Sequence, residues 1–204
     1  MLKIWGRISS INVRKVVLCA QMLDIPFQRM DAGLRFGVVN TPDYLMLNPN
    51  AMVPTIQDGA YTLWESNAIV RYLCARENRL YPSNLHTRFT AEQWMDWQQT
   101  SLNRASGPAF VQWIRTPAAQ RNDDLIAESV AATEPLLDLL DQRLQKHAFV
   151  VGEHMSMADL PIACEVHRWW GLPQKRPRWL HLERWYAQMR QQPGAGGVLD
   201  LPLS

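Results

Sequence analysis

VPTIQDGAYTLWESNAI, residues 53–69, contains two short β-prone runs separated by the pair Asp58-Gly59. Asp-Gly between such runs is a strong signal for the tight turn of a β-hairpin. Directly after the second run, the apolar residues change to the spacing of a helix. The stretch therefore predicts a β-hairpin with strands over 53–57 and 61–64, followed by a helix over 66–77.

Strand and helix patterns also alternate upstream of this hairpin. A short apolar run at 2–6 predicts a first strand, and residues 12–24 carry apolar side chains at helical spacing. Residues 26–30 suit a second strand, and a short helix is expected over 43–46. The predicted order is β-α-β-α-β-β-α. Because a helix joins the first two strands, we expect them to pair in parallel.

Beyond residue 79 the pattern becomes entirely helical. A turn-rich bridge precedes the predicted helices, which cover residues 88–115, 123–146, 157–170 and 180–191. Ser156 and Asp159 have the spacing of a capping box at the start of the third of these helices. The chain is therefore predicted to have two domains, an α/β domain over 1–79 and an all-helical domain over 87–204.

Composition and charge exclude several classes of function. The 204 residues carry a formal net charge of +2, which is too small to indicate a nucleic-acid or acidic-membrane partner. No apolar run is long enough for a membrane span, and no signal peptide is recognisable. The three cysteines are odd in number and widely spaced, as in reduced thiols, and the five histidines lack zinc-ligand spacing. We expect a cytoplasmic protein without a metal site.

Three short motifs occur in order in the α/β half, and a fourth lies in the helical half. They are SSINVR at 9–14, NPNAMVP at 48–54, WESNAI at 64–69 and SMADL at 156–160. Together they resemble the cytosolic glutathione S-transferase family over nearly the whole chain. The similarity is greatest to the serine-type bacterial, theta and delta groups, and Ser10-Ile11-Asn12 also resembles the Thr-x-Asn of the bacterial nu group. The resemblance implies a thioredoxin-like first domain, an all-helical second domain and a homodimer that uses glutathione as co-substrate.

Ser10 and Asn12 stand where the first strand gives way to the first helix. Their residue types alone favour helix capping, because their side chains satisfy free backbone N–H groups. The resemblance implies a catalytic role, and a helix N-terminus suits a thiolate. A free cysteine thiol has a pKa near 8.5, so only a few per cent of glutathione would be ionised at neutral pH. Ser10 is the predicted main partner of the thiolate, with Asn12 as the second donor, or as the main one if the nu-like resemblance governs.

The remaining motifs each have a structural interpretation, a strand start or a helix cap, beside the role that the resemblance implies. By the resemblance, Val53 pairs its backbone with the peptide part of glutathione, and Pro54 follows a cis bond. Glu65 is expected to pair the γ-glutamyl ammonium and Ser66 to hold the neighbouring carboxylate. Many relatives have a lysine where this chain has Met52. Arg35 is the predicted substitute for holding the glycine carboxylate.

The tryptophan-rich helical half offers candidates for a second-substrate pocket. Most tryptophans, such as Trp185, are expected in the core. Phe110, Trp113 and Trp170 are the predicted lining of an apolar pocket between the domains. The expected reaction is attack of the activated glutathione thiol on a small-molecule electrophile or a peroxide. Two alternatives stay open: a nu-like, glutathione-dependent disulfide reductase, and a non-catalytic ligand-binding or adaptor protein. The first-helix junction has no cysteine, which argues against relatives that use their own thiol.

Overall fold

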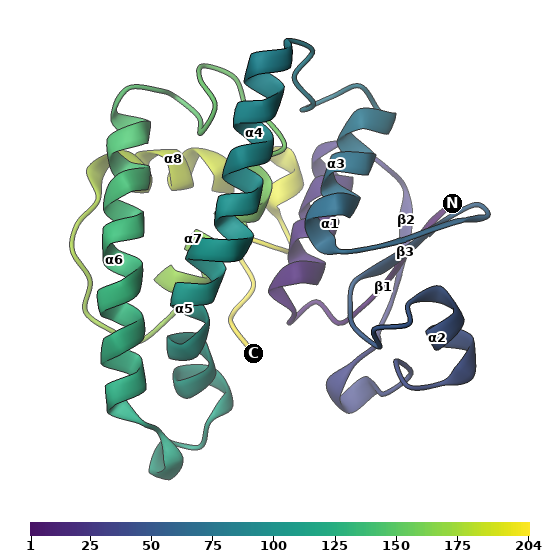
Figure 1. Ribbon diagram of the computed structural model, residues 1–204, viewed down its shortest axis with the longest axis horizontal. Coiled ribbons are helices and arrows are strands. Elements are labelled where there is room, and N and C mark those ends of the chain that lie inside the picture. Colours follow the sequence, from purple (N-terminus) through teal and green to yellow (C-terminus); the bar gives the residue numbers. More distant parts are fainter.

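A four-stranded sheet organises the first part of the computed structural model, which describes residues 1–204 (Figure 1). The elements in chain order are β1 (Leu2–Trp5), α1 (Ile11–Met22), β2 (Phe27–Met30), the 3₁₀ turn η1 (Leu34–Phe36), α2 (Pro42–Leu47), β3 (Thr55–Asp58), β4 (Tyr61–Trp64) and α3 (Ser66–Arg76). The strand order is β2-β1-β3-β4. The predicted element order is confirmed.

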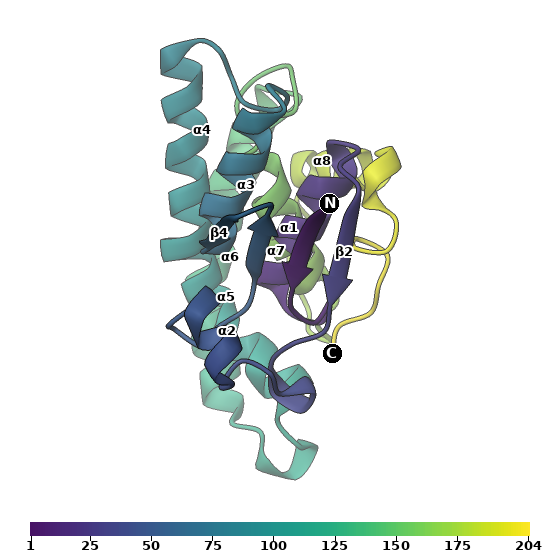
Figure 2. The ribbon, with the colours of Figure 1, turned by 90° about the vertical axis from the view of Figure 1, so that its right-hand side faces the viewer.

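Strand pairing follows the sequence patterns. β1 and β2 are parallel, as expected for strands joined through a helix, whereas β1 pairs antiparallel with β3. β3 and β4 form the predicted hairpin around Gly59. The first hairpin strand starts at Thr55 rather than at Val53, because Pro54 has no N–H to donate to a ladder. Figure 2 shows the four strands side by side, with α1 and α3 behind them.

Helices make up the second part of the chain. They are α4 (Leu85–Trp97), η2 (Gln98–Leu102), α5 (Asn103–Phe110), η3 (Val111–Arg115), η4 (Ala118–Gln120), α6 (Asp123–Gln145), α7 (Asp159–Trp170), α8 (Leu180–Arg190) and η5 (Pro193–Ala195). The helix predicted over 88–115 is one continuous helical stretch from α4 to η3. However, η2 and η3 are π-helical segments, which the sequence pattern did not predict.

One cluster of buried apolar side chains runs through both halves of the molecule. α1 joins the halves, because it packs against α3 on one side and α7 on the other. Trp185 is completely buried in this core, as predicted, and its indole N–H donates to the Asp159 carboxylate at 2.9 Å. The same carboxylate accepts the Ser156 N–H at 2.8 Å, which is one half of the predicted capping box, but α7 itself begins at Asp159, with Ala158 rather than Ser156 as its N-cap.

None of these helices combines the length and the apolar character that a bilayer-spanning helix requires.

Gly6 allows the end of β1 to approach both α1 and the loop before β3. Its φ is +147°, and a Cβ there would lie 2.4 Å from Val13 Cγ2 and 3.2 Å from Val53 Cβ. Gly6→Ala should therefore lower the free energy of unfolding by about 1–3 kcal/mol, the usual cost of overpacking. Urea unfolding followed by tryptophan fluorescence measures this effect.

Gly107→Ala is the matched control for Gly6→Ala. Gly107 lies inside α5, and a Cβ there would meet nothing within 4 Å. Alanine is the better helix former by about 1 kcal/mol, so this variant should be as stable as the parent or more so. Equal destabilisation by the two substitutions would contradict the packing explanation for Gly6.

Candidate active site

Two hollows with a common wall mark the candidate site, one between the sheet half and the helical half and one within the sheet half. The larger, of about 580 Å³, is lined from both halves, by Ser10 and Phe110 among others, and is called the interdomain pocket. The smaller, of about 180 Å³, is lined by Glu65 and Ser66 and is called the Glu65 pocket. Both include Asn12, Met52 and Val53 in their walls. A ligand of peptide length can therefore lie across the shared wall and reach both.

Ser10 occupies the N-cap position of α1, but its hydroxyl does not cap the helix. The backbone is extended there (φ −82°, ψ 126°), the side chain makes no capping hydrogen bond, and only the carbonyl accepts from the Arg14 N–H at 2.9 Å. Ser10 is 7% exposed and lines the interdomain pocket. Its O–H thus remains available to a ligand, beside the positive end of the helix dipole.

Asn12 connects the two hollows. It lies in the first turn of α1, and its Oδ1 accepts a hydrogen bond from the Ser66 hydroxyl at 3.3 Å. That bond leaves the amide NH₂ of Asn12 as a donor at the wall that the hollows share. Ser10 and Asn12, predicted from one tripeptide, therefore both face ligand space, and Asn12 is also tied to the start of α3.

Glu65 and Ser66 form the end of the smaller hollow. Glu65 has φ +71°, in the left-handed region that non-glycine residues rarely occupy. Conformations of this kind cost about 1–3 kcal/mol and cluster at functional sites. The Glu65 carboxylate makes no ion pair or hydrogen bond within the chain, whereas Ser66, the first residue of α3, is 4% exposed. A free carboxylate therefore stands beside a helix N-terminus, a combination suited to an ammonium and a carboxylate on one ligand.

Polar side chains hold the loop that carries Val53. The Tyr44 hydroxyl and the Asn48 side-chain amide donate to the Met52 carbonyl at 2.6 and 3.0 Å. Tyr44 also bonds the Thr55 hydroxyl at 2.9 Å, and burial raises the pKa of Tyr44, so the phenol stays a donor. The Val53–Pro54 bond is cis, as the resemblance implied. The Val53 backbone is thereby presented at the wall shared by the two hollows.

Three predicted site residues lie outside both hollows. Arg35 lies on η1, with its guanidinium 4.8 Å from the Phe36 ring. The Trp113 indole donates to Gln174 at 3.1 Å, and the Trp170 ring packs 5.8 Å from that of Trp179.

Phe110 does line the interdomain pocket, and the π-helical geometry of η3 explains why its predicted neighbour does not. Thr116 N–H donates to the Val111 carbonyl at 3.0 Å, five residues back rather than four. Side chains five apart therefore share a face, so Arg115 joins Phe110 at the pocket. Trp113, three residues after Phe110, does not.

Arginines at the interdomain pocket were missed by the sequence analysis. Arg7, Arg115 and Arg168 all line it, from the loop after β1, the end of η3 and α7. No local motif could have revealed the group, because its members are far apart in the sequence. The five-residue spacing of Phe110 and Arg115 would have been a signal only if the π-helical segment had been foreseen.

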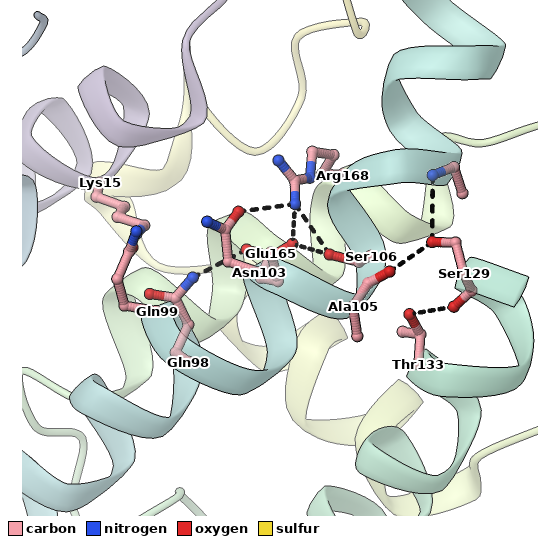
Figure 3. A network of polar contacts seen from close by, with 11 residues as sticks. Lys15, Gln98, Gln99, Asn103, Ala105, Ser106, Ser129, Thr133, Glu165 and Arg168 are labelled. Carbon is pink, nitrogen blue, oxygen red and sulfur yellow. Dashed lines mark hydrogen bonds and ion pairs between the residues drawn. The ribbon is translucent and has the colours of Figure 1, made fainter. Parts of the chain in front are cut away.

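A buried polar network lies beneath this pocket (Figure 3). The Glu165 carboxylate, 1% exposed, accepts hydrogen bonds from Gln98 at 2.9 Å and Ser106 at 2.5 Å and pairs with Arg168. Lys15 is fully buried nearby and donates to Gln99 at 2.8 Å. Burial lowers the pKa of Lys15 to about 8, and Glu165 partly opposes this shift. The network links α1, η2, α5 and α7 under the pocket floor.

Glu165→Ala should strongly destabilise the protein. The substitution leaves the buried Arg168 guanidinium without its counter-ion, a loss of about 3–5 kcal/mol. The midpoint of urea unfolding gives the measurement. Glu165→Leu combined with Arg168→Met removes both charges and should recover much of the loss. If Glu165→Ala were as stable as the parent protein, the ion pair of Glu165 and Arg168 would not be buried as described.

Comparison with known proteins agrees with this geometry. Residues 1–75 match the family model of the glutathione S-transferase N-terminal domain, and residues 102–193 match that of the C-terminal domain. The chain is 35% identical over 208 residues to glutathione S-transferase GstB of Escherichia coli K12, with all of both chains covered. It is 29% identical to rat glutathione S-transferase theta-1, with 98% of this chain and 87% of the relative covered.

A solved structure extends the similarity to the fold. The theta class glutathione S-transferase of Xanthomonas axonopodis pv. citri, crystallised with glutathione bound, superposes with a TM-score of 0.96 at 37% identity. The alignment covers 100% of this chain and 99% of that one. Because the full-length sequence similarity, both domain matches and the fold agree, the chain belongs to the glutathione S-transferase family.

Proposed function

We propose that this protein is a glutathione S-transferase that binds glutathione across the two hollows and activates its thiol for attack on an electrophile. One observation carries the proposal. The Ser10 hydroxyl stands at the N-terminus of α1, unused by the helix, in the interdomain pocket, which shares a wall with the Glu65 pocket. The structural relative crystallised with glutathione bound supports it.

The residues that line the two pockets match the parts of glutathione in order. Glu65 pairs the γ-glutamyl ammonium, and Ser66 at the start of α3 holds the adjacent carboxylate. The Val53 backbone pairs with the peptide part in the manner of an added strand. This placement brings the cysteinyl sulfur to the shared wall, near Ser10 and Asn12.

Activation follows from the surroundings of the sulfur. A hydrogen bond from Ser10, a second from the Asn12 amide and the positive end of α1 all favour the thiolate over the thiol. The thiol proton leaves to solvent. The sulfur then forms a bond to the electrophilic carbon while the leaving group departs with its electron pair. No thiol of the chain takes part, because Cys19, Cys74 and Cys164 are all buried.

Disulfide reduction is the second candidate, favoured by the position of Asn12 in both walls. A panel assay of the purified protein separates the activities: glutathione with an aryl halide, with an organic hydroperoxide and with a small disulfide. Conjugation or peroxide turnover supports the transferase, and turnover of the disulfide alone supports the reductase. No turnover at all, with glutathione still bound, would leave only a binding protein.

We also propose that the protein works as a homodimer, in which the first domain of one subunit meets the helical domain of the other. Leu85 and Phe89 support this, because they lie one helical turn apart on α4 and are 58% and 64% exposed. A two-fold interface would cover such a face in both copies. The cytoplasm, where thiols stay reduced, suits the three unpaired cysteines.

Sedimentation at micromolar concentration should give a mass of two chains. Phe89→Glu should shift the equilibrium toward one chain, since the charge would have to be buried. A stable mass near 23.5 kDa for the unmodified protein would contradict the dimer.

A further inference from the structure

Three guanidinium groups converge on the interdomain pocket without an acidic residue in its walls. Arg7, Arg115 and Arg168 line the pocket, and its other lining residues are uncharged. A pocket whose charged lining residues are all positive attracts negatively charged ligands. Since the second substrate of a transferase would enter here, the charge bears directly on what that substrate is.

Arg168 has one counter-ion but retains donors for a ligand. It is 7% exposed and pairs with Glu165 beneath the pocket. All its hydrogen bonds, to Glu165, Asn103 and Ser106, come from Nη2, as Figure 3 shows. Its Nε is buried and has no hydrogen-bond partner. The Nη1 group also makes no hydrogen bond within the chain, and it is the donor that Arg168 keeps for a ligand in the pocket.

Arg7 and Arg115 have no counter-ion at all. Neither makes a side-chain hydrogen bond or an ion pair within the chain, and Arg7 Nε is buried without a partner. Burial lowers the pKa of Arg7, and the charge of Arg115 lowers it further. Burial likewise lowers the pKa of Arg115, with Arg168 adding to the effect. Arg115 is therefore close enough to Arg7 on one side and to Arg168 on the other to be repelled by both, and a bound anion would relieve that repulsion.

Phe110 lies in the same wall and is only 6% exposed, whereas Leu34 and Val111, 65% and 42% exposed, give the pocket an apolar surface. The Arg115 and Arg168 guanidiniums lie 4.9 and 5.1 Å from the centre of the Phe110 ring, both at cation–π distance. These contacts hold the two cations beside an apolar face. The wall therefore suits a ligand with a flat apolar body and an anionic group.

We propose that the second substrate is an anionic electrophile, whose carboxylate or similar oxyanion is held by Arg7, Arg115 and Arg168 while its body packs on the apolar lining beside Phe110. The proposal rests on the proposed function, because it assigns a substrate class to the same site. The reactive carbon would then face the sulfur, which Ser10 holds in the same pocket. Arg115 is the principal specificity residue, since it has no counter-ion to lose and, unlike Arg7, is positioned against the Phe110 ring.

A matched pair of aryl chlorides tests the charge preference. 4-Chloro-3-nitrobenzoate and 4-chloro-3-nitrobenzamide have nearly the same shape and differ in charge. In both, the thiolate sulfur bonds to the ring carbon that carries chlorine, and chloride leaves with the electron pair. Relative to the uncatalysed rates, kcat/KM of the unmodified protein should favour the benzoate. Arg115→Gln should lower the benzoate-to-benzamide ratio by about tenfold or more, the scale of a lost charged hydrogen bond.

Arg176→Gln is the control. Arg176 is also an arginine beside an aromatic ring, 5.2 Å from that of Trp170, but it lies outside the pocket. This variant should keep the parent ratio. The affinity for glutathione, measured by calorimetry, should stay unchanged in Arg115→Gln. A fall in that affinity with an unaltered ratio would show that Arg115 holds the glycine carboxylate of glutathione, and would overturn the proposal.

Binding of unreactive 3-nitrobenzoate separates this proposal from the proposed function. Calorimetry on the glutathione-loaded protein should show binding that Arg115→Gln weakens by about tenfold. If neither chloride is conjugated but this binding pattern holds, the transferase function fails and the anion pocket stands. If both chlorides are conjugated with no preference for the benzoate, the anion pocket fails and the transferase function stands.

Discussion

Ser10→Ala should lower conjugating turnover at neutral pH by roughly ten- to a thousandfold, the scale for losing one donor that stabilises developing charge. Binding of glutathione should remain nearly intact, because Glu65, Ser66 and the Val53 backbone hold most of the ligand. The loss should shrink as the pH rises toward about 8.5, the pKa of a free thiol, since solvent then ionises the sulfur. Steady-state kinetics with an aryl halide across this pH range measures both effects.

Asn12→Ala is the comparison for Ser10→Ala. The larger loss in Ser10→Ala indicates serine-type activation, and the larger loss in Asn12→Ala indicates the nu-like type. Because Asn12 Oδ1 also accepts from Ser66 at 3.3 Å, Asn12→Ala should weaken glutathione binding as well. Full activity in both variants at neutral pH would show that neither Ser10 nor Asn12 activates the glutathione thiol.

Glu65→Ala should reduce the affinity for glutathione at least tenfold. The substitution leaves the ligand ammonium unpaired in a partly enclosed pocket, a loss of about 2–4 kcal/mol. The effect should be on binding rather than on the thiol pKa, since Glu65 lines the smaller pocket and Ser10 lines only the interdomain pocket. Isothermal titration calorimetry gives the affinity directly.

Glu65→Gln separates charge from shape at this position. It keeps the size and the hydrogen-bonding capacity of the side chain but removes the negative charge. It should lose most of the affinity that Glu65→Ala loses. Wild-type affinity in both variants would mean that the γ-glutamyl end of glutathione binds elsewhere.

The sheet half could be predicted from sequence because its signals are local. Asp58-Gly59 between two β-prone runs specifies a hairpin without reference to distant residues. The parallel pairing of β1 and β2 follows from the helix between them. The start of the first hairpin strand was predicted wrongly, at Val53. The strand starts at Thr55, just after Pro54, which has no N–H for strand pairing.

The helical half could be predicted less completely. Apolar spacing predicted a helix over 88–115, close to the helical stretch that begins at Leu85, but it did not reveal the π-helical segments η2 and η3. They nevertheless determine which side chains share a face. For this reason Phe110 lines the interdomain pocket and Trp113 does not.

The residues proposed to bind glutathione could be predicted from the sequence, whereas the three arginines of the interdomain pocket could not. Ser10, Asn12, Glu65 and Ser66 stand at helix starts, where residue type and position restrict what a side chain can do. Arg7, Arg115 and Arg168 meet only because the two halves pack through α1 and α7. Such a convergence depends on tertiary structure, so no pattern in a single sequence reveals it.

The most direct test of thiol activation is a pH titration of the thiolate ultraviolet absorbance of bound glutathione. In the unmodified protein the pKa of the bound thiol should lie about one to two units below its value of roughly 8.5 in solution. Ser10→Ala, with Asn12→Ala beside it, should raise that pKa toward the solution value. A bound thiol that titrates at its solution pKa in the unmodified protein, or whose pKa neither substitution raises, would contradict activation at the start of α1.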